Sequence, residues 1–397
     1  MPRFEPFPAL RYNTSGNVDI TQVTSPPYDV FDENVRQQYA QQNSHNIVKI
    51  DYPIESDGES RYDNSANTLN DWIAKNVLSV ESAPTFSIYR MHFTDEAGNA
   101  RTTIGVIGAL EVVDEGAPGV LPHERTTPKA KTDRLDLTRA TKCNLSPVWG
   151  LSLANGLTDL LRETAEVIAT CTDEEGVQHI IERVTDPVRI MAIQECVSSQ
   201  PVLIADGHHR YAISRTYRDE QRSANGLRDA DLTMTYVGEL IEEQLSVAAI
   251  HRLYNNTTDD ALIQVLQNFY EVSDAGQVGT HTIGQMATKG ALCLVRPDGR
   301  GTYLKPIEEK FDGIRNLDSA RLEHALLTVP HEVTYQHGVI EVLEKLEHKQ
   351  AQCAILIRPV SLTEIQRTAN TGELMPPKST FFTPKLRTGL VMRPLLK

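Results

Sequence analysis

The chain has 397 residues, a formal net charge of −14 and a composition that is 40% hydrophobic. This length exceeds that of a usual single domain, so we expect two domains, or one large body with an appended lobe. The negative charge opposes attraction to a phosphate backbone and argues against a nucleic-acid-binding protein. No run approaches the roughly 18 apolar residues of a membrane helix, and the first residues lack a signal-peptide pattern, so we predict a soluble cytoplasmic protein.

Helix-like and strand-like segments alternate along the chain, which predicts a mixed α/β fold. Residues 62–78 repeat apolar side chains at helical spacing, whereas residues 86–93 and 102–113 are rich in the β-branched and aromatic residues of strands. The short connection between these two strands suggests a hairpin. Further along, we expect a strand over residues 148–154 and a helix over residues 157–171.

The segment PVLIADGHHRYAISRTYRDEQ, which begins at Pro201, gives the clearest structural signal. Residues 201–205 predict a buried strand and residues 209–223 a helix, so a glycine turn places backbone N–H groups at a helix N-terminus. A polar, glycine-containing stretch follows. We therefore expect one α/β domain over residues 1–224 and a second α/β lobe, packed against it, over residues 225–397.

Within this segment, the turn DGHHRY has a first interpretation as a phosphate site. Gly207 can adopt a positive φ and lets a ligand approach the backbone closely. The helix N-terminus favours an anion, and Arg210 can hold a phosphate through two hydrogen bonds. Asp206, at the carboxyl end of the strand, is placed as a magnesium ligand or general base.

The same turn has two other interpretations. His208 and His209 could bind a metal ion, although adjacent histidines point in different directions and rarely bind one ion together. Alternatively, Asp206 caps a helix while the histidines pack or face water. The sequence alone leaves these alternatives open.

The segment PHERTTPKAKTDR, residues 122–134, is basic in an otherwise acidic chain. Such a loop could contact a nucleotide or an acidic substrate, and Glu124, beside His123, could act as a base. The alternative is a solvated charged loop. Its cations are Arg125, Lys129, Lys131 and Arg134.

The segment MPPKSTFFTPKLRTG, residues 375–389, carries donors suited to phosphate among three prolines. It contains Lys378, Ser379 and Lys385 but lacks the upstream glycines of a Walker A loop. The alternative is a docked tail, because phenylalanines near a terminus usually pack against a core.

The segment SPPYDVFDE, residues 25–33, also has two interpretations. Tyr28 and Asp29 could line a pocket. The other interpretation is a rigid turn in which Asp29 or Asp32 caps a helix.

Taken together, five motifs resemble the domain of unknown function 1015 family, which is widespread in bacteria and archaea. They are PFPALRY, SPPYDV, HERT, ADGHHRY and GELMPPKSTFFTPKLRTGLV, in this order, and the resemblance covers residues 7–395. The run over residues 206–212 is also similar to the nucleotide-binding turn of the ParB/sulfiredoxin superfamily, which includes free serine kinases. That resemblance implies a ParB/sulfiredoxin-like nucleotide-binding core with a second α/β lobe.

The superfamily resemblance also implies residue roles. Gly207 and His208 would supply backbone amides, and His209 and Arg210 would supply phosphate-binding side chains. Asp206 would hold magnesium or orient the acceptor hydroxyl. The essential cysteine of sulfiredoxins falls at His208, which argues against sulfinic-acid reductase activity, and a ParB role fits poorly because we find no helix-turn-helix with a basic face.

Our leading hypothesis is a nucleotide-dependent kinase that phosphorylates a small hydroxylated metabolite, with free serine as the first candidate acceptor. ATP or ADP would be the donor, with Mg²⁺. Glu124 is the predicted base, ahead of Asp133. Lys378 and Arg125 would neutralise charge on the transferred phosphoryl group. Ser379 and Lys385 complete the predicted phosphate-binding set, so segments distant in sequence must meet at one pocket.

Two alternatives belong to other classes. A non-catalytic nucleotide-binding regulator would use the same phosphate-binding residues, 207–210, but would have no acceptor pocket. A metal-dependent hydrolase would centre on His208 and His209. The expected partners are a nucleotide and a small-molecule substrate, without nucleic acid or membrane, and a homodimer is compatible with the sequence.

Overall fold

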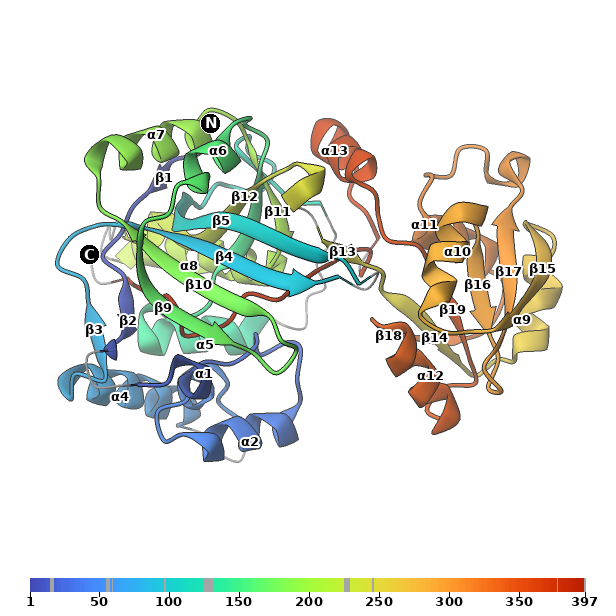
Figure 1. Ribbon diagram of the computed structural model, residues 1–397, viewed down its shortest axis with the longest axis horizontal. Coiled ribbons are helices and arrows are strands. Elements are labelled where there is room, and N and C mark those ends of the chain that lie inside the picture. The colour runs from blue at the N-terminus through green and yellow to red at the C-terminus, as the bar shows by residue number, and fades with distance from the viewer. Residues whose placement is uncertain are drawn as a thin grey trace. The chain divides into compact units, whose positions relative to one another are not determined.

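The chain forms two compact units, each of mixed α/β structure, in a computed structural model (Figure 1). The first consists of Met1–Asp95, Ala100–Leu245 and Pro384–Lys397, and the second of Glu96–Asn99 and Ser246–Thr383. The predicted mixed α/β class is confirmed. The structure describes residues 1–14, 18–54, 58, 60–95, 98–123, 131–224, 229–244, 246–376 and 378–395, without the side chains of residues 131, 132, 223 and 224.

A mixed nine-stranded sheet forms the centre of the first unit. Its order is β6-β11-β8-β12-β5-β4-β10-β9, with β1 paired to β5 outside this path. The pairs β11–β6 and β12–β8 are parallel and the others antiparallel, and β4 and β5 form the predicted hairpin. The strands are β1 Phe4–Glu5, β4 Phe86–Thr94, β5 Ala100–Glu111, β6 Val120–Leu121, β8 Val148–Ser152, β9 Glu166–Thr172, β10 Gln178–Val184, β11 Val202–Asp206 and β12 Leu232–Glu239.

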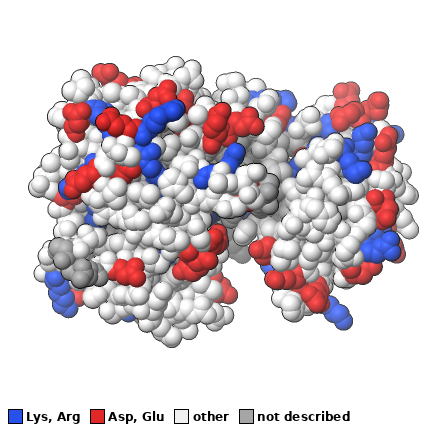
Figure 2. Space-filling model, viewed as in Figure 1, with Lys and Arg blue, Asp and Glu red and all other residues white. Residues whose placement is uncertain are grey.

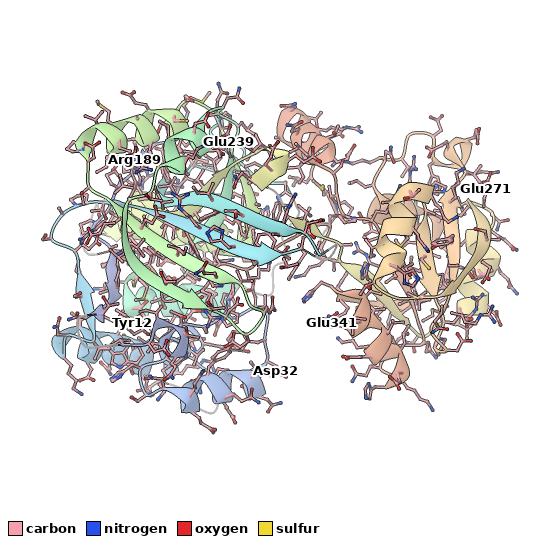
Figure 3. The ribbon with its side chains drawn as sticks, viewed as in Figure 1. Tyr12, Asp32, Arg189, Glu239, Glu271 and Glu341 are labelled. Atoms are coloured by element: carbon pink, nitrogen blue, oxygen red, sulfur yellow. The ribbon has the colours of Figure 1, made fainter. Side chains whose placement is uncertain are left out.

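Helices α6 and α7 cover one face of this sheet (Figure 1). Leu157 and Ile193 from these helices pack with Val202 and Ile204 of β11 in one hydrophobic cluster. Glu239, at the end of β12, fixes the start of α6 by accepting hydrogen bonds from two backbone N–H groups (Figure 3). The helices are α1 Ile20–Val23, α2 Glu33–Gln42, α3 Val48–Asp51, α4 Arg61–Ala74, α5 Lys131–Thr141, α6 Leu157–Arg162, α7 Pro187–Ser198 and α8 His208–Ala224.

One predicted helix is half wrong. Only residues 157–162 of the expected helix over residues 157–171 are helical, because residues 166–172 form β9 and pair with β10. β9 contains Val167 and Ile168, whose branched side chains favour a strand. By contrast, Asp32 caps α2 by accepting the Val35 N–H at 3.0 Å, as one interpretation of the SPPYDVFDE segment expected (Figure 3).

The second unit is built on a six-stranded antiparallel sheet of order β15-β17-β16-β19-β14-β18. Leu292 and Leu294 of β16 pack into one cluster while Cys293 and Val295 pack into another, so both faces are covered. Its elements are β14 His251–Asn255, α9 Asp259–Leu266, β15 Tyr270–Gln277, α10 His281–Lys289, β16 Leu292–Val295, β17 Arg300–Pro306, α11 Asp318–Ala325, β18 Glu332–Gln336, α12 Val339–Glu347, β19 Cys353–Leu356 and α13 Leu362–Thr371.

The compact units do not divide where the sequence suggested a boundary, between residues 224 and 225. The reason is that β12 lies inside the first sheet, between β8 and β5. The chain also returns to the first unit near its end, where β21 (Arg393–Pro394) pairs with β7 (Cys143–Asn144). Two further short pairs are β2 (Leu10–Tyr12) with β3 (Leu78–Val80), and β13 (Val247–Ala248) with β20 (Phe381–Phe382).

The surface carries both signs of charge. Figure 2 shows acidic and basic side chains interspersed on the visible face of each unit, with no continuous basic stripe among the described residues there. Within the part of the chain that the structure describes, no helix has both the length and the apolar character needed to cross a bilayer.

Candidate functional site

The start of α8 has the predicted strand, glycine turn and helix. β11 ends at Asp206, Gly207 has a φ of 84°, and the Tyr211 N–H donates to the Gly207 carbonyl at 2.9 Å. A Cβ atom at Gly207 would lie 2.9 Å from Nε of Arg210. Glycine therefore suits the left-handed backbone here, and a larger residue would also displace the Arg210 guanidinium.

Two cations meet the carboxylate of Asp206 at this turn. Arg210 Nη2 lies 3.0 Å, and Lys385 Nζ 3.6 Å, from Asp206 Oδ2. Arg210 Nη1 also donates to the backbone carbonyl of Pro147. The Asp206, Arg210 and Lys385 side chains are 27%, 11% and 16% exposed, so this group of charges is largely shielded from water.

The surroundings fix the charge of the two titratable groups at the helix start. Burial opposes ionisation of Asp206, but Lys385, Arg210 and the Gly207 N–H outweigh it and hold the pKa of this carboxyl well below its usual range. Burial, reinforced by nearby His123, lowers the pKa of His208 well below its ordinary value. At neutral pH the site therefore holds two cations, one carboxylate and a neutral imidazole.

The His208 ring packs against a histidine from outside the DGHHRY turn. The His123 and His208 rings lie 4.7 Å apart, edge to face, and the His123 N–H points at His208 Nε2 over 3.4 Å. His123 is buried and bonds the Ile204 carbonyl through Nδ1 at 2.5 Å. Among the residues that the structure describes, no three His, Cys, Asp or Glu side chains are grouped to hold a metal ion.

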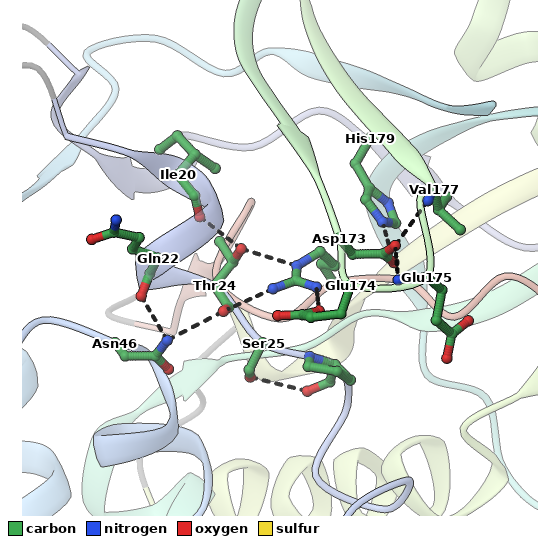
Figure 4. Close-up of polar contacts among 12 residues, drawn as sticks. Ile20, Gln22, Thr24, Ser25, Asn46, Asp173, Glu174, Glu175, Val177 and His179 are labelled. Atoms are coloured by element: carbon green, nitrogen blue, oxygen red, sulfur yellow. Dashed lines mark hydrogen bonds and ion pairs between the residues drawn. The ribbon is translucent and has the colours of Figure 1, made fainter. Parts of the chain in front are cut away.

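Lys385 reaches the site on a segment that is anchored two residues further on. Arg387 is buried and donates from Nε to Thr24 Oγ1 and from Nη2 to the Thr24 carbonyl, both at 3.0 Å (Figure 4). Its Nη1 donates to Glu174 at 3.2 Å, and its backbone N–H donates to the Tyr89 hydroxyl at 3.1 Å. These four bonds fix the backbone that carries Lys385.

A buried polar chain continues from this anchor. The Tyr89 hydroxyl, having accepted the Arg387 N–H, donates to His179 Nδ1 at 2.8 Å. His179 Nε2 in turn donates to Asp173 at 3.0 Å (Figure 4). Burial lowers the pKa of His179, so its neutral tautomer, with the proton on Nε2, completes the chain.

A second charged pair lies near Arg210. Arg134 stacks over the Tyr28 ring at 3.7 Å and pairs with Asp51 through Nη1 and Oδ1 at 3.3 Å. Burial lowers the pKa of Arg210, but nearby carboxylates outweigh it, first Asp206 and to a smaller degree Asp51, so the pKa of this guanidinium is raised. The SPPYDV segment therefore contributes Tyr28 to the surroundings of this site.

The predicted site residues lie in different parts of the structure. Those in the first unit are Asp206, Gly207, His208, His209, Arg210 and Lys385. Lys378 and Ser379 belong to the second unit, where Ser379 is buried and donates to the Pro376 carbonyl at 2.7 Å. Glu124 and Arg125 lie outside the described residues.

A family model described as a protein of unknown function, DUF1015, matches residues 4–320. The chain belongs to the DUF1015 family. This confirms the family that the five sequence motifs indicated. No curated protein matches this DUF1015 member.

Several solved structures are similar to this DUF1015 chain. A conserved hypothetical protein from Pyrococcus furiosus is 14% identical, with 67% of this chain and 87% of that chain covered and a TM-score of 0.36. A free serine kinase in complex with AMP is 13% identical, with 67% and 84% covered and a TM-score of 0.36. C-terminally truncated SbnI from Staphylococcus aureus is 12% identical, with 70% and 84% covered and a TM-score of 0.38.

Replacing His208 by asparagine is expected to reduce the loss of stability between pH 7 and pH 5. Because the folded chain keeps this histidine neutral, only the unfolded chain binds a proton near pH 6.5; stability is therefore present above that pH and is lost as pH falls below it. One such group contributes at most ~1.4 kcal/mol per pH unit. Calorimetric melting temperatures at pH 7, 6 and 5 measure this, with the exposed His348→Asn as control. Equal pH slopes in His208→Asn and wild type would contradict it.

Proposed function

We propose that this protein binds the phosphate groups of a nucleotide at the start of α8 and transfers a phosphoryl group to a small hydroxylated acceptor, with free serine as the first candidate. The observation that carries this proposal is the meeting of Arg210 and Lys385, from distant segments, beside a left-handed glycine that opens a long helix. The proposed donor is ATP or ADP.

The local physical chemistry favours a phosphate at this point. The first backbone N–H groups of α8 have no acceptor within the helix, and the helix dipole adds positive potential there. Arg210 and Lys385 supply two cations against the single charge of Asp206. Asp206 holds Arg210 and Lys385 close to the helix start, where a bound phosphate would contact the same two cations.

In the proposed reaction, the acceptor hydroxyl oxygen forms a bond to the terminal phosphorus of the nucleotide. The bond from that phosphorus to its bridging oxygen breaks, the shortened nucleotide leaves with the electron pair, and the hydroxyl proton passes to a carboxylate base. Asp206 is a weak base because its pKa is low, so its proposed role is to orient the cations. Glu124 remains the predicted base, and Arg125, Lys378 and Ser379 remain predicted phosphate contacts.

Asp206 is poorly placed to bind a magnesium ion directly. The carboxylate is already paired with Arg210 and Lys385, so a divalent cation there would compete with two positive charges. Bound magnesium would neutralise charge on the nucleotide phosphates. We therefore assign no step of the reaction to an ion held by Asp206.

A nucleotide-binding regulator that transfers no phosphate is the second candidate. A regulator needs no base, and the carboxylate described at the helix start, Asp206, has a pKa too low for that role. Phosphorus NMR separates the two candidates. With ATP or ADP and free serine, a kinase produces a new phosphomonoester signal, whereas a regulator produces none across a broad panel of hydroxylated acceptors.

Replacing Lys385 by methionine is expected to weaken nucleotide binding about tenfold or more, because a charge-assisted hydrogen bond contributes about 1.5–3 kcal/mol. A thermal-shift titration with ATP and ADP, with and without magnesium, measures the change, since a ligand of the native state raises the melting temperature. The control is Lys75→Met, which removes a lysine from an exposed pair with Asp71. If wild type shows no shift with any nucleotide, the proposed function is wrong.

A further inference from the structure

A small cavity lies beside Arg210 within the first unit. Its volume is ≈ 50 Å³. This is room for roughly three to five water molecules, or for a ligand of about six or seven non-hydrogen atoms. Its polar lining includes Asp51, Arg134, Asn144, Arg210, Ser214 and Thr233, together with Thr138 and Ser146.

Two buried side chains of opposite charge line this cavity. The Arg134 and Asp51 side chains are only 8% and 4% exposed. Arg134 uses Nε for Asp133 and Nη1 for Asp51, and within the described residues none of its hydrogen bonds uses Nη2. Asp51 accepts the Arg134 hydrogen bond through Oδ1, and within the described residues no hydrogen bond uses its Oδ2. Arg134 Nη2 can therefore donate a hydrogen bond to a ligand in the cavity, and Asp51 Oδ2 can accept one.

The rest of the polar lining is uncharged. Ser214 and Thr233 share a hydrogen bond of 2.9 Å between their hydroxyls, and Ser214 bonds the Arg210 carbonyl at 3.0 Å. Asn144 accepts the Met234 N–H at 3.0 Å through Oδ1, and its Nδ2 is a further donor. Hydroxyl and amide groups of this kind suit a polar ligand better than an apolar one.

The balance of charge narrows the ligand class. Arg210 is paired with Asp206, and Arg134 is paired with Asp51 at 3.3 Å, so the charges around the cavity are already balanced. A simple anion or cation would add a buried charge without a partner, which is costly. A zwitterion adds one charge of each sign and leaves the cavity balanced.

We propose that this cavity is the acceptor subsite, and that it takes a compact α-amino acid with its carboxylate on Arg134 and its ammonium group on Asp51. The inference rests on the proposed function in one respect: the nucleotide phosphates lie at the helix start, and Arg210 borders both sites. The size of the cavity restricts the ligand to amino acids with a side chain of one or two non-hydrogen atoms.

The test is calorimetric titration of the full chain with L-serine, L-alanine, lactate and ethanolamine, each with and without ADP. Lactate lacks the ammonium group and ethanolamine the carboxylate, so wild type is expected to bind the two amino acids at least tenfold more tightly than either. Asp51→Asn is expected to lose at least tenfold in amino-acid affinity while keeping its ADP-dependent thermal shift. Thr138→Leu, which fills the cavity, should do the same.

Thr141→Leu is the matched control for the cavity-filling variant. Thr141 and Thr138 lie on α5 and each donates to the carbonyl four residues earlier, but Thr141 does not line the cavity. Wild type that responds to ADP but binds no amino acid overturns this inference and leaves the proposed function standing. If wild type binds the amino acids but shows no response to any nucleotide, the proposed function is wrong and the amino-acid site stands. If Asp51→Asn does not fold, Thr138→Leu decides, and wild-type affinity in that variant overturns the inference.

Discussion

Replacing Arg210 by leucine is expected to abolish the nucleotide-dependent rise in melting temperature. The substitution removes the guanidinium nearest the helix start, which donates to Asp206 at 3.0 Å and to the Pro147 carbonyl. It also leaves Lys385, at 3.6 Å, as the one Lys or Arg ion-pair partner of Asp206 among the described residues. Loss of a charge-assisted contact of about 1.5–3 kcal/mol corresponds to a roughly 10- to 100-fold weaker affinity.

Arg215→Leu is a demanding control for this experiment. Arg215 lies on the same helix and also donates to a backbone carbonyl, that of Val113, and to a carboxylate, that of Glu115. Titration calorimetry with ATP and ADP should show near wild-type affinity for Arg215→Leu and loss of binding for Arg210→Leu. Equal affinities in the two variants would count against a phosphate site at the start of α8.

Replacing Arg387 by leucine is expected to lower the free energy of unfolding of the first unit by about 3 kcal/mol. The change removes the Arg387 donor of the buried Thr24 hydroxyl and leaves the Thr24 carbonyl with the longer bond from Asn46 Nδ2 at 3.3 Å. An unsatisfied buried polar group costs about 1–3 kcal/mol. It also frees the segment that carries Lys385, so nucleotide affinity should fall although Arg387 itself does not contact Asp206.

Glu174→Ala is the control for Arg387→Leu, because it removes the ion pair of Arg387 but keeps the hydrogen bonds of Arg387 to Thr24. Glu174 is 53% exposed and accepts only one of the bonds of Arg387, so its removal should cost less than about 1 kcal/mol. Denaturant unfolding measures stability, and titration with ADP measures the effect on Lys385. Arg387→Leu with unchanged nucleotide affinity would show that Lys385 needs no anchor.

Local sequence predicted the turn at the start of α8 correctly, because its determinants lie within a few residues. An apolar run, a carboxylate, one glycine and a helical pattern suffice to specify β11, Gly207 and α8. The strand β9 was mistaken for helix because Val167 and Ile168 also continue the apolar pattern of α6. Pairing with β10, a partner that lies further along the chain, decides the outcome there.

The site residues that sequence reasoning missed depend on tertiary contacts. Asp51 ends a four-residue helix in an ordinary apolar segment, and only the fold brings it to Arg134. Arg387 was one of several basic residues near the end of the chain, and nothing local distinguishes it from its neighbours. Lys385 was predicted as a phosphate ligand, but its proximity to Asp206 depends on the return of the chain to the first unit.

That return sets the order in which the site can be assembled during synthesis. Asp206 and Arg210 emerge from the ribosome before the second unit, whereas Lys385 and Arg387 emerge after it. The strand pair β13–β20 joins the two ends of the second unit, so this unit can close on itself before the last segment is added. A nascent chain that stalls within the second unit would therefore carry the β11–α8 turn with Arg210 but without Lys385. Under the proposed function, it would bind nucleotide weakly until Lys385 has left the ribosome.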